Sequence, residues 1–103
     1  MTQAANTSSA STLPLRNGGQ ILVDQIRLHG TKRVFLVPGE SYLPCIDALN
    51  EHKGAIEPIV CRQESGAGYM AEAYGKLTNE PGVCFVTRGP GATNASIAVH
   101  TAY

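Results

Sequence analysis

The chain has 103 residues, of which 43% are hydrophobic and 16% are charged, and its eight basic residues balance its eight acidic ones. This composition is typical of a globular protein, and the balanced charge disfavours binding to nucleic acid or to an anionic membrane surface. Because no apolar run reaches the roughly 18 residues that a membrane-spanning helix requires, no membrane span is expected.

The N-terminal segment and the cysteines carry little sign of function. Residues 1–17 are rich in Ser and Thr and lack the apolar stretch of a signal peptide, so we predict a flexible leader followed by a folded part over residues 18–103. Cys45, Cys61 and Cys84 form no Cys-x-x-Cys pair. We interpret them as small, buried hydrophobic residues in a reducing, cytoplasmic compartment.

Helical and strand patterns alternate along the first half of the folded part. Helical spacing of apolar residues predicts a helix over 19–30 that ends at Gly30, and the apolar run "RVFLV" predicts a strand before the turn Pro38-Gly39. A second helix is predicted over 41–54, with Ser41 as its N-cap, Pro44 tolerated in its first turn and Gly54 closing it.

The alternation continues in the second half. "IEPIVC" predicts a strand over 56–61, weakened by its proline, and "SGAGYMAEAYGKL" predicts a helix over 65–77. "VCFVT" predicts a third strand over 83–87, and "ATNASIAVHTAY" predicts a helix over 92–103.

This order predicts an α/β protein with a parallel sheet and flanking helices. Three strand-to-helix turns, "PGES", "QESGAG" and "RGPGAT", should then meet at the carboxyl edge of the sheet, where open α/β folds bind ligands. Glu40 and Glu64 are therefore expected to face one crevice. About 85 ordered residues are few for a sheet that must be covered on both faces, so we expect the front of a longer protein or a chain that needs a partner.

Two interpretations of Glu64 follow from its position. Acidic residues are common in the first turn of a helix, where they stabilise its N-terminus as solvated carboxylates, and the local sequence favours this interpretation. The alternative is an acid/base carboxyl, because the small residues Gly66, Ala67 and Gly68 allow another backbone or a flat ligand to approach. Such packing would desolvate Glu64 and raise its pKa.

Other candidate positions are less specific. "GPGAT", which contains Gly89, Pro90 and Gly91, either cradles a phosphate or is only a tight turn, and it lacks the third glycine of the dinucleotide fingerprint. Glu40 taken alone is a helix-terminal charge. The three histidines have no metal-ligand spacing, so no metal ligand is predicted in the chain.

Taken together, "VFLVPGES", "IVCRQESGAGYMAEAYGKLT" and "PGVCFVTRGPGATNA" resemble the pyrimidine-binding N-terminal domain of thiamine-diphosphate enzymes, in particular the acetolactate synthase large-subunit group. The resemblance covers residues 18–103 and implies an incomplete flavodoxin-like or Rossmann-like fold that binds thiamine diphosphate. In that family the glutamate at the position of Glu64 hydrogen-bonds a ring nitrogen of the aminopyrimidine and thereby activates the cofactor for 2-keto acid chemistry.

The resemblance also implies roles for the other two turns. Pro90, between Gly89 and Gly91, matches the position that packs on the pyrimidine ring. Glu40 follows Pro38-Gly39 at a variable position facing the reaction centre, where several 2-keto acid decarboxylases have an acidic residue and acetolactate synthases typically have glycine. The catalytic candidates are thus Glu64 and Glu40, and the cofactor-binding candidates are Glu64, Pro90, Gly89, Gly91, Pro38 and Gly39.

The family holds the diphosphate and Mg²⁺ with a later Gly-Asp-Gly…Asn-Asn segment, which this sequence does not contain. The chain alone is therefore expected to be inactive. In its complete form we expect a homodimeric or homotetrameric enzyme that decarboxylates and ligates 2-keto acids, with FAD as a possible further cofactor. The alternative is a non-catalytic α/β binding or interaction module.

Overall fold

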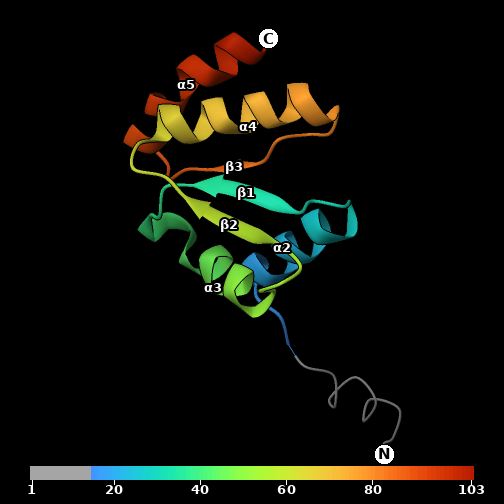
Figure 1. Ribbon diagram of the computed structural model, residues 1–103. Coiled ribbons are helices and arrows are strands. Elements are labelled where there is room, and N and C mark those ends of the chain that lie inside the picture. Colours follow the sequence, from blue (N-terminus) through green and yellow to red (C-terminus); the bar gives the residue numbers. More distant parts are fainter. Residues whose placement is uncertain (1–14) are drawn as a thin grey trace, which may run out of the picture.

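The computed structural model describes residues 15–103 (Figure 1). The described elements, in chain order, are α2 (Gly18–Leu28), β1 (Arg33–Leu36), the 3-10 turn η1 (Glu40–Tyr42), α3 (Leu43–Glu51), β2 (Glu57–Val60), α4 (Glu64–Thr78), β3 (Cys84–Phe85) and α5 (Pro90–Ala102). The leader predicted over 1–17 lies outside the described residues except for its last three, and of these Asn17 is the N-cap of α2.

The three strands form one parallel sheet in the order β2-β1-β3. In the register, Phe35 of β1 lies opposite Ile59 of β2 and Cys84 of β3. Pro58 is accommodated in β2 because an edge strand does not need every N–H group. The prediction of an α/β protein with a parallel sheet and flanking helices is confirmed.

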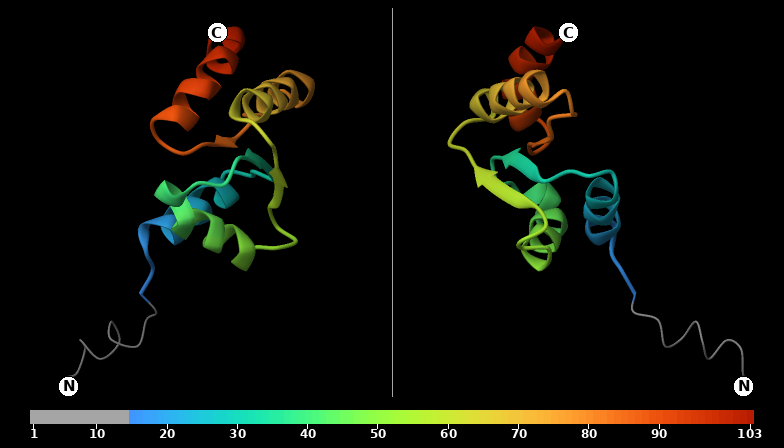
Figure 2. Two further views of the ribbon diagram at one scale, coloured as in Figure 1. Left: turned by 90° about the vertical axis from the view of Figure 1, so that its left-hand side faces the viewer. Right: turned by 45° about the vertical axis from the view of Figure 1, so that its right-hand side comes forward.

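Helices cover both faces of the sheet. Figures 1 and 2 show α2 and α3 on one side, and α4 on the other with α5 beside it. Side chains alternate along the central strand, so Val34 and Leu36 pack toward α2 and α3 while Phe35 packs toward α4. All three are at most 5% exposed, and burying each large side chain contributes roughly 1.5–3 kcal/mol.

Helix α4 packs through small residues. Its buried positions are Ala67, Gly68 and Ala71. A Cβ added at Gly68 would lie 2.6 Å from the Cβ of Ala98, so glycine here permits the close approach of α4 and α5. Leu77, on the same helix, is 88% exposed. Apolar side chains of the described part therefore remain uncovered on the outer surface of these two helices.

The prediction that Ser41 caps the second helix is wrong. The N-cap of α3 is Tyr42, without a side-chain hydrogen bond, and Ser41 lies one residue earlier in η1. Ser41 lies in this 3-10 turn, and its hydroxyl contacts that of Thr87 instead of capping the helix. The helix also ends earlier than predicted, with His52 as its C-cap, and Gly54 takes the left-handed conformation in the turn that follows.

Gly30 takes the left-handed conformation just beyond the C-cap of α2, as its predicted role as a helix stop requires. Within residues 15–103, no helix is both long enough and apolar enough to cross a membrane.

Candidate functional site

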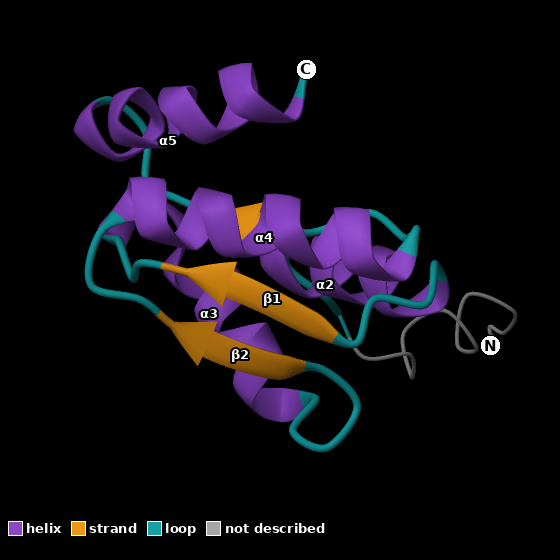
Figure 3. Cartoon of the chain, turned by 45° about the horizontal axis from the view of Figure 1, so that its top comes forward, coloured by secondary structure: helices purple, strands orange, loops and turns teal. Residues whose placement is uncertain are grey.

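The three strand-to-helix turns lie at one edge of the sheet. Because β1, β2 and β3 are parallel, the chain leaves each of them at the carboxyl edge. Figure 3 shows the arrowheads of β1 and β2 pointing to the side at which α4 begins. Pro38-Gly39-Glu40, Gln63-Glu64 and Gly89-Pro90-Gly91 are the segments that follow the strands there.

Glu64 lies at this edge of the sheet, where α4 begins. It is half-buried and is the first residue of α4, where its negative charge also stabilises the helix N-terminus. Its side chain reaches α5: the Asn94 amide Nδ2 donates to Oε1 at 3.0 Å. The other oxygen, Oε2, lies 3.3 Å from the place that a Cβ on Gly91 would occupy. Glu64 therefore has one oxygen held by Asn94 and a second beside the glycine turn.

The third turn presents a low, apolar surface next to Glu64. Gly89 has φ +70° and ψ −117°, a conformation that a residue with a side chain rarely adopts. Pro90 is exposed and is the first residue of α5, a position that suits its fixed φ. Gly91 is buried against Thr87, and a Cβ added to Gly91 would lie 2.7 Å from Thr87 Cγ2. A flat ring can thus approach Glu64 without meeting side chains from Gly89 or Gly91.

Thr87 connects the first turn to the third. The backbone of Gly39 is extended, with φ −154°, so its conformation does not demand glycine. Glycine is required by space: a Cβ there would lie 2.5 Å from Thr87 Cβ. The hydroxyls of Ser41 and Thr87 are 2.7 Å apart, and the Arg88 N–H donates to Ser41 Oγ at 3.3 Å. Glu40, between Gly39 and Ser41, is exposed.

Two buried or half-buried groups beneath this edge are influenced by Glu64. Burial, together with the smaller effects of Cys84, Glu64 and Cys45, raises the pKa of Tyr42. Burial, followed by Cys61 and Glu64, raises the pKa of the Cys84 thiol. The Tyr42 hydroxyl donates to the carbonyl of Val37 and lies 3.3 Å from that of Phe85, so it spans the ends of β1 and β3.

The structure thus brings several of the predicted site residues together. Glu64 lies against Gly91, in the same turn as Gly89 and Pro90, while Pro38, Gly39 and Glu40 stand at the same edge and are tied to this turn through Thr87. Sequence reasoning missed Asn94, Thr87 and the contact of Ser41. A signal for Asn94 was present, because it follows Gly91 by three residues and so lies on the same face of the helix.

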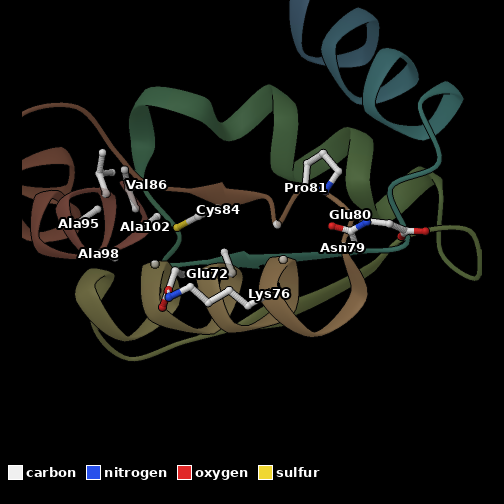
Figure 4. A pocket seen from close by; sticks show the side chains of 15 residues that line it. Glu72, Lys76, Asn79, Glu80, Pro81, Cys84, Val86, Ala95, Ala98 and Ala102 are labelled. Carbon is white, nitrogen blue, oxygen red and sulfur yellow. The ribbon is translucent and has the colours of Figure 1, made fainter.

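A groove among the described residues lies away from this edge. It has a volume of about 590 Å³ and runs between α4, α5 and β3 (Figure 4). Small side chains line it, among them Ala71, Ala95 and Ala98, with the ion pair of Glu72 and Lys76 at its wall. None of the predicted site residues lines this groove. Its shape therefore adds nothing to the chemistry of the carboxyl edge.

Two histidines lie at the C-terminal ends of helices. His29 and His52 are the C-caps of α2 and α3, and His52 Nε2 lies 3.1 Å from Asp24 Oδ1. Within residues 15–103, no three His, Cys, Asp or Glu side chains are grouped closely enough to hold a metal ion.

The chain is similar to known proteins over most of its length. Residues 16–103 match the model of the thiamine pyrophosphate enzyme family, N-terminal TPP binding domain. The chain is 42% identical over 90 residues to the acetolactate synthase large subunit of Pyropia yezoensis, covering 85% of the chain and 15% of that protein. It is 44% identical over 78 residues to the acetolactate synthase isozyme 2 large subunit of Escherichia coli (strain K12), covering 76% of the chain and 14% of the relative.

A third relative matches over more of the chain than these two. The mitochondrial acetolactate synthase of Schizosaccharomyces pombe is 40% identical over 94 residues, which are 91% of the chain and 14% of that protein. The chain therefore spans about 15% of the length of these curated relatives.

Proposed function

Because the chain belongs to the thiamine pyrophosphate enzyme family, through its N-terminal TPP binding domain, we propose that its carboxyl edge binds the aminopyrimidine ring of thiamine diphosphate. We further propose that the complete protein is an acetolactate synthase-like enzyme acting on 2-keto acids. The observation that carries the proposal is the position of Glu64: a half-buried carboxyl with one oxygen held by Asn94 and the other beside a glycine turn.

The residues at this edge fit the pyrimidine half of the cofactor. An aminopyrimidine is flat and weakly basic, and it needs one group that can share a proton with a ring nitrogen and an apolar surface against its face. Glu64 supplies the carboxyl. The backbone of Gly89, which has open space beside it, leaves the approach open, and the exposed ring of Pro90 supplies the apolar contact. The donor set therefore suits the ring and has nothing that would repel it.

Each residue has a distinct part in this proposal. Glu64 holds or releases a proton at the ring nitrogen, and Pro90 packs on the ring. Pro38 and Gly39 carry Glu40 to the neighbouring position, where its exposed carboxylate faces the substrate and affects which 2-keto acid reacts. The bound cofactor itself would supply the electron sink for decarboxylation and carboligation.

The diphosphate half requires partners of another kind. A diphosphate with Mg²⁺ is bound by oriented dipoles and by oxygen ligands of the metal. We propose that these groups come from a segment other than residues 15–103, as the resemblance to the family implies, and that FAD, where used, is bound outside this part as well.

Assembly and compartment are proposed on separate grounds. Exposed apolar side chains on α4 and α5, such as Leu77 at 88% and Val99 at 70%, support a homodimer or homotetramer. The cysteines Cys45, Cys61 and Cys84 are free thiols, which supports a reducing compartment such as the cytoplasm.

The proposed function is tested by Glu64→Gln in the intact protein loaded with thiamine diphosphate and Mg²⁺. The amide keeps the shape of the side chain but cannot share a proton with the ring in the same way. Exchange of the thiazolium proton of the bound cofactor for deuterium, followed by NMR, should slow by about 10²–10⁴-fold, the usual size of a general acid–base contribution.

A matched control is Glu80→Gln, which removes an exposed carboxylate in the loop after α4 and should leave the exchange rate unchanged. If Glu64→Gln exchanged the thiazolium proton as fast as the wild type, Glu64 would not be the activating carboxyl.

A further inference from the structure

We propose that Asn94 is a positioning residue that gives the two oxygens of Glu64 different roles. Oε1 is kept as a hydrogen-bond acceptor, and Oε2 is the oxygen that carries the exchangeable proton. This inference rests on the proposed function for its consequence in the enzyme, because the proton would be shared with the bound ring. Its first test, however, needs no cofactor.

The direction of the hydrogen bond between Asn94 and Glu64 determines which oxygen of Glu64 remains an acceptor. The contact is Nδ2 to Oε1 at 3.0 Å, and an amide nitrogen only donates. If Oε1 were protonated, an O–H and an N–H donor would face each other. A proton arriving at Glu64 is therefore directed to Oε2, and Oε1 continues to accept from Asn94.

The second oxygen of Glu64, Oε2, lies beside the turn after β3. This oxygen lies 3.3 Å from the place where a Cβ on Gly91 would stand, beside the turn that holds Pro90. Gly91 and Asn94 are three residues apart on α5 and therefore lie on one face of the helix. One turn of α5 thus fixes Oε1 and leaves Oε2 beside the surface proposed for the pyrimidine.

Other groups do not provide this bias. Glu64 adds to the burial that raises the pKa of Tyr42, in η1, and of Cys84, in β3. The pKa of each is raised by burial, so both are uncharged through the acid and neutral range in which a carboxyl titrates. Asn94 is the neighbour that donates a hydrogen bond to Glu64.

The test is a titration of the intact protein without cofactor. The carboxyl carbon of Glu64 is followed by ¹³C NMR from pH 3 to 8 in the wild type and in Asn94→Leu, which keeps the approximate volume of the side chain but removes the donor. Because the variant removes a hydrogen bond to the carboxylate and the contact is partly exposed to solvent, the midpoint should rise by about 1 pH unit.

Asn94→Asp is the second variant, because it is isosteric with the wild type and places an acceptor where the donor was. Its Glu64 midpoint should also rise, whether or not Asn94→Leu folds. The matched control is Ser96→Ala on the same helix, whose hydroxyl donates to the carbonyl of Thr93 and which should leave the midpoint unchanged. In the wild type, the side-chain ¹⁵N–¹H signals of Asn94 should shift with the protonation of Glu64, and this shift should disappear in Glu64→Gln.

The results separate this inference from the proposed function. An unchanged midpoint in Asn94→Asp, or Asn94 amide signals that ignore the titration of Glu64, would overturn the role of Asn94 even if the protein bound thiamine diphosphate. Conversely, a raised midpoint in a protein that does not bind the cofactor would refute the proposed function and leave the arrangement of the two oxygens standing. In the loaded protein, Asn94→Leu should also shift the pH profile of thiazolium proton exchange in the same direction as the midpoint.

Discussion

The hydroxyl oxygens of Ser41 and Thr87 lie 2.7 Å apart, although the residues are 46 positions apart in the sequence. Their contact joins the turn after β1 to the turn after β3, and Thr87 also fills the space next to Gly39 and Gly91. Thr87, in the segment between β3 and α5, therefore holds the turn of Glu40 next to the turn of Pro90. This arrangement makes Thr87 a residue whose hydroxyl and methyl groups can be tested separately.

Removing the hydroxyl pair should cost a modest amount of stability. Thr87→Val keeps the shape of the side chain and deletes Oγ1, and Ser41→Ala deletes the partner. Because a hydrogen bond of this kind contributes about 0.5–1.5 kcal/mol, Thr87→Val should lose roughly that much in urea unfolding. Ser41→Ala should lose more, because its hydroxyl also accepts from the Arg88 N–H. The double variant should lose less than the sum of the two, because the pair can be lost only once. Strictly additive losses would show that the two hydroxyls do not interact.

The glycines at this edge should differ sharply in their tolerance of alanine. Gly91→Ala places a Cβ 2.7 Å from Thr87 Cγ2 and 3.3 Å from Glu64 Oε2, so we expect a loss of about 1–3 kcal/mol from overpacking. Adding Thr87→Ser removes that methyl group and should restore part of the loss. Gly39→Ala meets Thr87 Cβ at 2.5 Å and should not be rescued by the same change, because serine keeps its Cβ.

Gly66→Ala is the matched control for these glycines. Gly66 lies within α4 and an added Cβ would meet nothing within 4 Å, so alanine should be neutral or stabilising by up to about 1 kcal/mol. Urea unfolding of all four variants gives the comparison. Equal losses for Gly66→Ala and Gly91→Ala would contradict the packing described around Thr87.

The parallel α/β architecture could be predicted from sequence because its signals are local. Apolar runs such as those around Val34 and Phe85 mark the strands, and Gly30 marks the end of a helix by its backbone freedom. Parallel pairing then places the turns at one edge without any knowledge of side-chain contacts. The position of Glu64 at that edge follows from the same reasoning.

The details of the site could not be predicted, because they depend on contacts between distant segments. Serine is a preferred N-cap residue, so the sequence predicts that Ser41 caps the helix. In the structure its hydroxyl contacts that of Thr87 instead. The sequence predicts that Gly39 is a turn glycine, but its backbone is extended. Glycine is needed there because Thr87 occupies the space that a Cβ would take. Local pattern therefore located the edge, while tertiary packing decided which side chains meet there.

Glu40 offers a prediction about the substrate rather than the cofactor. It is exposed at the start of η1, and Glu40→Gly removes its carboxylate without changing the Ser41–Thr87 contact. In the intact enzyme this change should alter turnover or the ratio of products formed from two competing 2-keto acids, while the affinity for thiamine diphosphate changes little. A variant with altered cofactor affinity but unchanged turnover and product ratio would rule out this role for Glu40.

Alkaline pH should destabilise the protein through Tyr42 and Cys84. Burial raises the pKa of each above its ordinary value, 10.0 for the phenol and 9.0 for the thiol. The unfolded chain therefore loses these protons at lower pH than the folded chain, and the folded state binds more protons in the interval between the two values. Stability from this source is fully present below about pH 9 and declines as the pH rises through the raised pKa values.

The free energy of unfolding in urea, measured under reducing conditions, should be lower at pH 10 than at pH 7. Tyr42→Phe and Cys84→Ala should each make that fall smaller, whereas Tyr103→Phe, at a fully exposed position, should not. If the fall were as steep in both variants as in the wild type, the alkaline sensitivity would come from groups other than these two.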